Sequence, residues 1–238
     1  MTTYDIREVL PGVFRIPVPL EGNPLKELNS YLFLGSREAG TRNLLVDTGF
    51  RTEGCKKALL EGLAQLGVSM EDTDILLTHL HADHSGNAPE LIRPGGKVYI
   101  SREDYRFMDG TLQEHRSERF RENGIAEDLL QAMLACTPSR TMAAPLSFRD
   151  YTLLEEGDMI PAGRYMLRAI WTPGHTPGHF CFEVCGTGAM LLGDHVLFDI
   201  TPNITDWWDV PDSLGDYLRS LDKIAAYPVT LPLPGHRE

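Results

Sequence analysis

The stretch THLHADHSGN (78–87) places three histidines and an aspartate close together in the chain. Adjacent imidazoles have no use in packing, whereas neutral imidazole and carboxylate together suit zinc or iron. Residues two apart share a face of an extended chain, so His79 and His81 are expected to reach one metal ion. Asp83 and His84 then turn toward a second ion. The stretch therefore predicts metal binding.

Further ligands are expected from three later segments, because four side chains cannot complete two metal sites. The motif begins at the end of DILLT (74–78), a predicted strand, and each of these segments likewise follows a run that predicts a strand. They are TPGHTPGH (172–179) with His175, LLGDH (191–195) with Asp194, and LPGH (233–236) with His236. Rigid strand ends hold side chains in fixed positions, which favours a preorganised site.

Three residues beside these segments are expected to orient the ligands instead of binding metal. Metal-ligating groups usually need hydrogen-bonded partners of their own. His179 and His195 are neighbours of the later ligand segments, and Asp47 ends the apolar run NLLV (43–46). For Asp47, the local sequence fits a turn-capping aspartate equally well.

The apolar pattern predicts a mixed α/β fold. Short runs rich in Val, Leu, Phe and Tyr, bounded by Gly and Pro, predict strands at 12–18, 29–35, 43–49, 74–78, 97–101, 150–154, 165–172, 179–184, 189–194 and 229–233. Helical spacing predicts helices at 52–66 and 213–226, the second capped by Ser213. Strands at both ends of the chain with helices between them indicate two sheets covered by helices, a four-layer α/β/β/α sandwich.

The chain is expected to form a single domain over 1–238, with one insertion. The segment after Arg102 is charged and lacks a strand pattern, so two or three inserted helices are predicted within about 102–147. Together with 23–29 and 198–208, this insertion is expected to line a substrate pocket whose individual residues the sequence does not identify.

Composition limits the classes of partner. The formal net charge of −12 argues against nucleic acid or an anionic membrane, because a basic face is their usual footprint. No export signal or membrane-length apolar stretch stands out, and the four cysteines form no CxxC pair, so a cytoplasmic protein with reduced thiols is expected. The sequence leaves open whether the chain forms a homo-oligomer.

Taken in order, these motifs resemble those of metallo-β-lactamase-fold hydrolases, the superfamily that includes glyoxalase II, acyl-homoserine lactonases and several nucleases. The matching segments are LLVDTG (44–49), THLHADHSGN (78–87), TPGHTPGH (172–179), LLGDH (191–195) and LPGH (233–236). The resemblance implies that His79, His81 and His175 bind one metal, that Asp83, His84 and His236 bind the other, and that Asp194 bridges them. His81 stands where flavodiiron proteins have a glutamate.

The same resemblance implies a dinuclear metal-dependent hydrolase. Two divalent ions, zinc with iron or manganese as alternatives, would generate a bridging hydroxide that cleaves an ester, thioester or lactone. Asp83 would also act catalytically, carrying the proton to the leaving group. Because the two ions outweigh the charges of two carboxylates and one hydroxide, the substrate is expected to be a small and anionic molecule.

Three other functions stay open at this stage. A mono-iron persulfide dioxygenase shares the HxHADH signature, a metal-dependent RNA or phosphodiester hydrolase shares the fold, and a non-catalytic metal-holding module needs only the ligands. The acidic balance weighs against the nuclease. Similar proteins with a segment like GNPLKELNSYLF (22–33) usually continue past the last histidine, so a C-terminal segment is expected to be missing.

Overall fold

A computed structural model describes residues 5–36, 38, 40–108, 111–136 and 142–237. Its larger sheet has seven strands in the order β1-β2-β3-β4-β5-β6-β7. They are β1 (Arg7–Leu10), β2 (Val13–Pro19), β3 (Glu27–Phe33), β4 (Asn43–Val46), β5 (Thr73–Leu76), β6 (Val98–Ser101) and β7 (Thr152–Leu154). Neighbours from β1 to β4 are antiparallel, and those from β4 to β7 are parallel.

The smaller sheet has five strands in the order β12-β11-β10-β9-β8. They are β8 (Met159–Ala162), β9 (Tyr165–Trp171), β10 (Phe180–Val184), β11 (Ala189–Gly193) and β12 (Leu231–Pro234). Only the pair β11–β12 is parallel. The C-terminal strand therefore lies at one edge of this sheet, next to β11.

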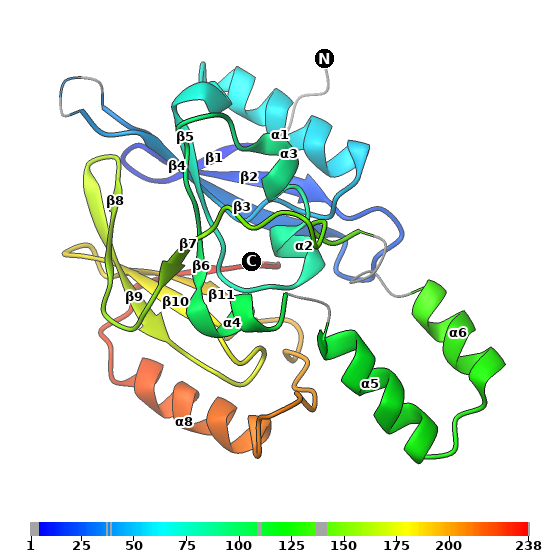
Figure 1. The fold of residues 1–238 in the computed structure, drawn as a ribbon. Helices are drawn as coiled ribbons and strands as arrows, with labels where there is room; N and C mark the ends of the chain where they lie inside the picture. Colours follow the sequence, from blue (N-terminus) through cyan, green and yellow to red (C-terminus); the bar gives the residue numbers. More distant parts are fainter. Residues whose placement is uncertain (1–4, 37, 39, 109–110, 137–141, 238) are drawn as a thin grey trace.

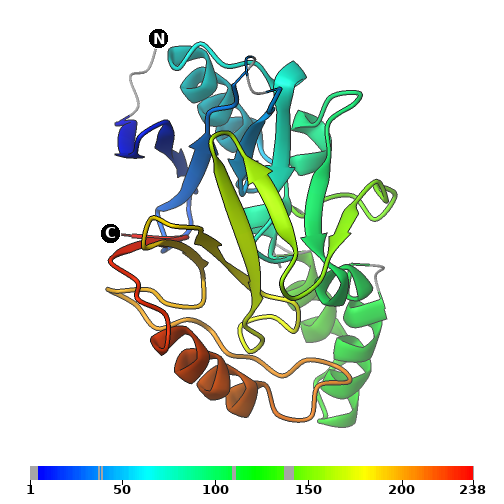
Figure 2. The same ribbon diagram turned by 90° about the vertical axis from the view of Figure 1, so that its left-hand side faces the viewer.

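Alternation of side chains along the strands builds the layers. In β10, Phe180 and Phe182 enter the core between the two sheets, whereas Cys181 enters a separate core beneath α8 (Ser213–Ala225). This is the two-residue period of a strand buried on both faces. On the far side of the larger sheet, Leu59 of α1 (Glu53–Gln65) and Leu91 of α3 (Ala88–Leu91) fill a third core. The predicted four-layer α/β/β/α sandwich is confirmed (Figures 1 and 2).

Both long covering helices begin at a side-chain cap. The hydroxyl of Thr52 accepts a hydrogen bond from the Cys55 backbone N–H at the start of α1. The carboxylate of Asp212 accepts one from the Gly215 N–H at the start of α8. The prediction that Ser213 caps α8 is therefore wrong by one residue: an aspartate oxygen takes the role, and Ser213 is the first helical residue.

Helices α4 (Arg102–Arg106), α5 (Thr111–Glu122) and α6 (Glu127–Ala135) follow β6 in the predicted insertion. Residues 109–110 and 137–141 of that predicted segment lie outside the described residues. In Figure 1, α5 and α6 extend away from the sandwich, beyond α4. No helix among the described residues combines the length and apolarity needed to cross a membrane.

The sequence did not indicate β1 and β8, each of which lies at one edge of its sheet. Both have four residues and are half exposed, so neither carries a continuous apolar run. Edge strands pair on one side only and are commonly short and polar. The remaining strands lie within two residues of the predicted ranges at most of their ends.

We expect Phe182→Ala to lower the free energy of unfolding by about 3–5 kcal/mol, because it opens a cavity between the two sheets. Phe182 is 0% exposed, whereas Phe198 is 54% exposed and provides a matched control. Phe198→Ala should change stability by less than about 0.5 kcal/mol. Urea denaturation of the three proteins measures both effects, and equal losses in the two variants would contradict this description of the core.

Candidate metal centre

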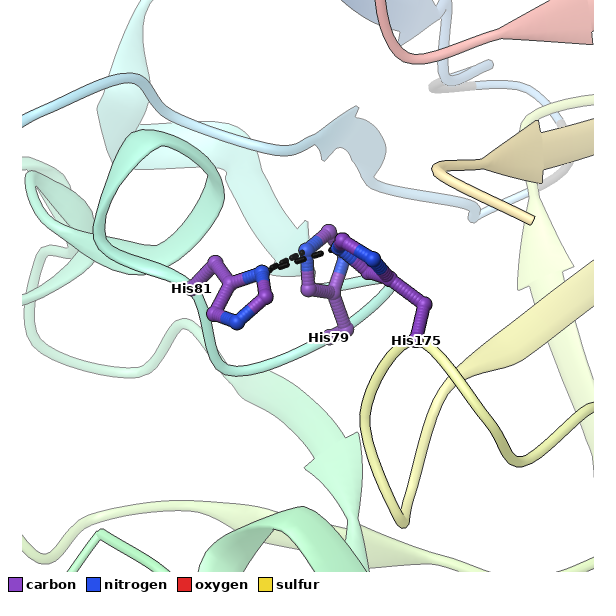
Figure 3. A group of neighbouring side chains, drawn as sticks. All are labelled: His79, His81 and His175. Atoms are coloured by element: carbon purple, nitrogen blue, oxygen red, sulfur yellow. Dashed lines mark hydrogen bonds between the residues drawn. The ribbon is translucent and has the colours of Figure 1, made fainter. Parts of the chain in front are cut away.

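Three histidines from two loops face one another at the carboxyl ends of β5 and β9. His81 Nδ1 lies 3.1 Å from His79 Nε2 and 2.9 Å from His175 Nε2. Figure 3 shows the three rings with these nitrogens directed at one point between them. His79 and His175 are buried, and His81 is half-buried. This grouping is one of those that could hold a metal ion.

A second group lies beside the first and joins the motif to the C-terminal loop. His84 Nε2 is 3.2 Å from His236 Nε2, which in turn is 3.4 Å from Asp83 Oδ2. Asp83 and His84 belong to the short helix α2 (Ala82–Ser85), and His236 follows β12. These three residues also form a grouping able to hold a metal ion.

Asp194, at the end of β11, lies between the two groups. Its Oδ2 is 3.5 Å from His175 Nε2, and its Oδ1 is 3.4 Å from His84 Nε2 and 3.5 Å from His236 Nε2. The buried Oδ1 has no hydrogen-bond partner among the residues that the structure describes. Each carboxylate oxygen therefore faces a different group of histidines.

Hydrogen bonds on the outer side of the rings orient four of these histidines. His79 Nδ1 lies 3.0 Å from Thr78 Oγ1, and His84 Nδ1 lies 2.8 Å from Asp47 Oδ2. His175 Nδ1 faces the Asn203 carbonyl and His236 Nδ1 faces the Glu27 carbonyl, each at 2.8 Å. Carbonyl and carboxylate oxygens only accept, so the ring Nδ1 carries the proton. When such a ring is neutral, its Nε2 atom is left with a lone pair directed inward.

Asp47 lies behind the motif and connects it to the end of β4. Its carboxylate accepts hydrogen bonds from the Thr78 backbone N–H at 2.9 Å, the Thr78 hydroxyl at 2.8 Å and His84 Nδ1. Because the Thr78 hydroxyl donates to Asp47, its oxygen accepts from His79. Asp47 therefore orients one histidine of each group, and its backbone adopts φ +59° to do so.

The other two residues expected to orient ligands lie behind Asp194. His179 Nε2 accepts the backbone N–H of Asp194 at 3.2 Å, while its Nδ1 faces the Thr172 hydroxyl at 2.8 Å. His179 thus fixes the main chain that carries Asp194. His195 is buried against Tyr217, with ring centroids 5.3 Å apart, and touches none of the candidate ligands by a hydrogen bond among the described residues.

Electrostatics differ between the two groups. Burial and the neighbouring imidazoles lower the pKa of His79 well below its usual value, and burial with His175 lowers the pKa of His81 to about 3. Burial also lowers the pKa of His175. Three neutral rings with convergent lone pairs are the donor set that a zinc-type cation requires.

The second group is polarised by carboxylates. Burial lowers the pKa of His84 and of His236, but the attraction of Asp194 and of Asp47 or Asp83 outweighs burial and leaves both pKa values raised. The same attraction outweighs burial for the carboxyls and lowers the pKa of Asp83 and Asp194. Cationic partners therefore stabilise both carboxylates in their ionised form.

The donor set of both groups fits divalent metal ions. Imidazole nitrogens and carboxylate oxygens suit zinc, iron and related ions, and the outer hydrogen bonds fix the ring tautomers in the way that metal-ligating histidines need. The buried Asp194 Oδ1, without a hydrogen-bond donor, gains a partner when a cation lies between it and the histidines.

Comparison with known proteins shows the family of the chain. The family model of the metallo-beta-lactamase superfamily matches residues 28–236. The chain belongs to this superfamily. A metallo-beta-lactamase family protein from Thermus thermophilus superposes with a TM-score of 0.82 at 32% identity, over 97% of this chain and 75% of that one. The resemblance found in the motifs is thus confirmed.

The curated proteins that this chain resembles are longer than the chain itself. The lactamase-like protein adaB of Aspergillus niger is 28% identical over 236 residues, which are 98% of this chain and 57% of that protein. An atrochrysone carboxyl ACP thioesterase, nsrC of Aspergillus novofumigatus, is 25% identical over 236 residues, 98% of this chain and 56% of that protein. The chain therefore spans little more than half the length of these superfamily members.

Sequence reasoning missed two residues that hold the ligand loops of this superfamily member. Asp104 in α4 is fully buried and binds both loops of the three-histidine group, and burial raises its pKa to about 7 against the opposing effect of its hydrogen-bond donors. Trp207 stacks on His81, with centroids 5.9 Å apart, and donates its indole N–H to the His175 carbonyl at 3.2 Å. The only local signal was SxxD at Ser101–Asp104, a helix start.

One predicted pocket residue has a different role. Asn29, within the predicted wall 23–29, is buried and donates its side-chain amide to the carbonyls of Pro234 and Arg237 at 3.0 and 3.2 Å. Its backbone N–H donates to the Gly235 carbonyl at 2.7 Å. Asn29 thus fastens the loop of His236 to β3.

The loop 198–208 connects the insertion with the metal centre. Trp208 stacks on His115 of α5, with ring centroids 4.3 Å apart and planes 4° apart, and Arg119 of α5 forms an ion pair with Asp206. The same loop carries Asn203, whose carbonyl orients His175, and Trp207. The insertion therefore packs on the segment that holds two candidate ligands.

The two groups should lose metal at different pH. Metal competes with protons for its ligands, so affinity falls once the pH drops below a ligand's pKa. The raised pKa values of His84 and His236 mean that acidification toward the usual range of a histidine pKa should already weaken the second group. The three-histidine group, with lowered pKa values, should keep its metal over that range.

Equilibrium dialysis against zinc followed by elemental analysis measures this difference. His236→Ala and His81→Ala leave one intact group each and assign the two affinities. Simultaneous loss from both groups, or earlier loss from the three-histidine group, would contradict the electrostatic description.

Proposed function

We propose that this member of the metallo-beta-lactamase superfamily is a hydrolase that uses two divalent metal ions, with zinc as the natural choice, to cleave a thioester or related acyl ester. The observation that carries the proposal is the position of Asp194, which presents one carboxylate oxygen to each group of histidines. A carboxylate shared in this way suits two cations held side by side.

The seven ligand roles are part of this proposal. His79, His81 and His175 would hold one ion, Asp83, His84 and His236 the other, and Asp194 both. Divalent ions in these positions would polarise a carbonyl oxygen and lower the pKa of water from 15.7 to about 7, and no serine or cysteine of the chain would be needed as the nucleophile. Asp47 and His179 keep His84 and Asp194 in place during the reaction.

Asp83 is proposed to transfer the proton. Its side chain is 14% exposed against 8% for Asp194, so solvent reaches more of it. Its Oδ2 also contacts His236 Nε2. Asp83 would accept the proton of the attacking water and deliver it to the thiolate or alkoxide as the acyl carbon–sulfur or carbon–oxygen bond breaks.

The choice of an acyl thioester is supported by relatives. Two similar proteins, nsrC of Aspergillus novofumigatus and AgnL7 of Paecilomyces divaricatus, are named atrochrysone carboxyl ACP thioesterases, and the latter is 25% identical over 98% of this chain. The site fits this chemistry because divalent ions held by these ligands would stabilise the negative charge that develops on a thioester oxygen. Small anionic acyl thioesters are therefore the first substrates to test.

Asp83→Asn should lower kcat for thioester hydrolysis by about 10²–10⁴-fold, because the amide removes both an anionic ligand and the proton carrier. Acyl-CoA thioesters, aryl esters and lactones form the substrate panel, with released thiol or acid as the readout. Metal per chain is measured on the same samples.

Asp158→Asn is the matched control, because Asp158 is exposed and, among the residues that the structure describes, its carboxylate accepts only the Glu155 backbone N–H. It should retain the activity of the unchanged protein. Hydrolysis by Asp83→Asn at the unchanged rate would overturn the assignment. Oxygen-dependent oxidation of glutathione persulfide without thioester cleavage would point to the persulfide dioxygenase instead.

A further inference from the structure

We infer that Asp104 is a positioning residue that sets the distance between the two ligand loops of the three-histidine group. This inference rests on the proposed metal binding at that group. Asp104 is not itself a candidate ligand, and it lies on α4, which starts the inserted helical segment. It acts on the metal through the backbone of its neighbours.

The contacts of the carboxylate carry the inference. Asp104 Oδ2 accepts the Leu80 backbone N–H at 2.8 Å and the Thr176 hydroxyl at 2.9 Å, and Oδ1 accepts the Gly178 backbone N–H at 2.7 Å. Leu80 lies between His79 and His81, and Thr176 follows His175. One buried carboxylate thus binds the two loops that supply all three histidines.

The backbone of Asp104 is fixed as firmly as its side chain. The Ser101 hydroxyl at the end of β6 accepts the Asp104 backbone N–H at 3.0 Å and caps α4. A Cβ on Gly178 would lie 2.1 Å from Ser101 Oγ and 2.2 Å from the Asp104 nitrogen. The loop 175–179 therefore packs directly onto the first turn of α4, which only glycine at 178 permits.

Small displacements of these loops matter because metal coordination tolerates little error. Zinc–nitrogen bonds are about 2.0–2.1 Å long, and a functional site must hold its groups within about 0.5 Å. Loss of hydrogen-bonded partners behind the ligands typically costs about 10–100-fold in metal affinity. Asp104 occupies that position for two loops at once, so its loss should affect the three-histidine group more than the second group.

Asp104→Asn is the sharpest test. The amide keeps the shape of the side chain, but its NH₂ must face the N–H of either Leu80 or Gly178, and two donors repel each other. We expect cobalt(II) or zinc to bind the three-histidine group about 10–100-fold more weakly, with little change at the group of Asp83, His84 and His236. Cobalt(II) absorption spectra and competition with a chelator report the two affinities.

Asp74→Asn provides the control for general destabilisation. Asp74 lies at the opposite end of β5 and binds Arg42 Nε at 2.8 Å and the Lys97 backbone N–H at 3.0 Å. It should lower the melting temperature without changing the relative affinities of the two groups. A merely structural role for Asp104 would likewise weaken both groups together, in proportion to the loss of thermal stability, and would overturn the inference.

A second variant covers a failure of Asp104→Asn to fold. Thr176→Val removes one of the three donors with little change of shape, and it should weaken the same group, to a smaller extent. Unchanged affinities in Thr176→Val would overturn the inference. If the unchanged protein binds two ions but hydrolyses nothing, only the hydrolase proposal fails; if it binds no ion, both proposals fail.

Discussion

The candidate metal centre depends on one constraint: an inward-facing imidazole nitrogen can bind a cation only when it is free of a proton. The protein meets this constraint from outside, by giving the opposite nitrogen of His79, His84, His175 and His236 an oxygen to which it donates. The acceptors come from different strands and loops, so the whole sandwich contributes to the tautomer of each ring.

The sequence predicted the inner residues of this centre but not all of the outer ones. His79, His81 and His84 stand out because dense histidine has no packing purpose, and His175, Asp194 and His236 because they follow strands. Asp104 and Trp207 carry no such signal, since their roles arise from contacts with loops distant in sequence. The segment after Arg102 is charged and its sequence predicts helices. Only the folded structure shows that the carboxylate of Asp104 in this segment is fully buried.

Prediction of the fold was limited in a similar way, because buried strands showed in the sequence and half-exposed edge strands did not. Central strands such as β10 and β11 are buried on both faces and show in the sequence as apolar runs, whereas β1 and β8 at the sheet edges do not. Asn29 illustrates the limit for polar residues. It lies in the segment 23–29 that the sequence places at a pocket wall, and the folded structure adds a contact that the sequence did not indicate: Arg15 Nε donates to its Oδ1 at 2.8 Å, and its amide donates to the Pro234 carbonyl.

The contacts of His236 tie metal binding to the completed fold. Its loop is held by β3, through Asn29 and through the Tyr31 hydroxyl, which donates to the Pro234 carbonyl at 2.9 Å. Gly235 allows this approach, because a Cβ there would lie 2.7 Å from Asp194 Oδ1. In the folded chain, the last candidate ligand is thus held by contacts with both sheets. Metal that binds this arrangement and not the unfolded chain must stabilise the contact between the two sheets, so the strength of the centre and the stability of the sandwich are linked quantities.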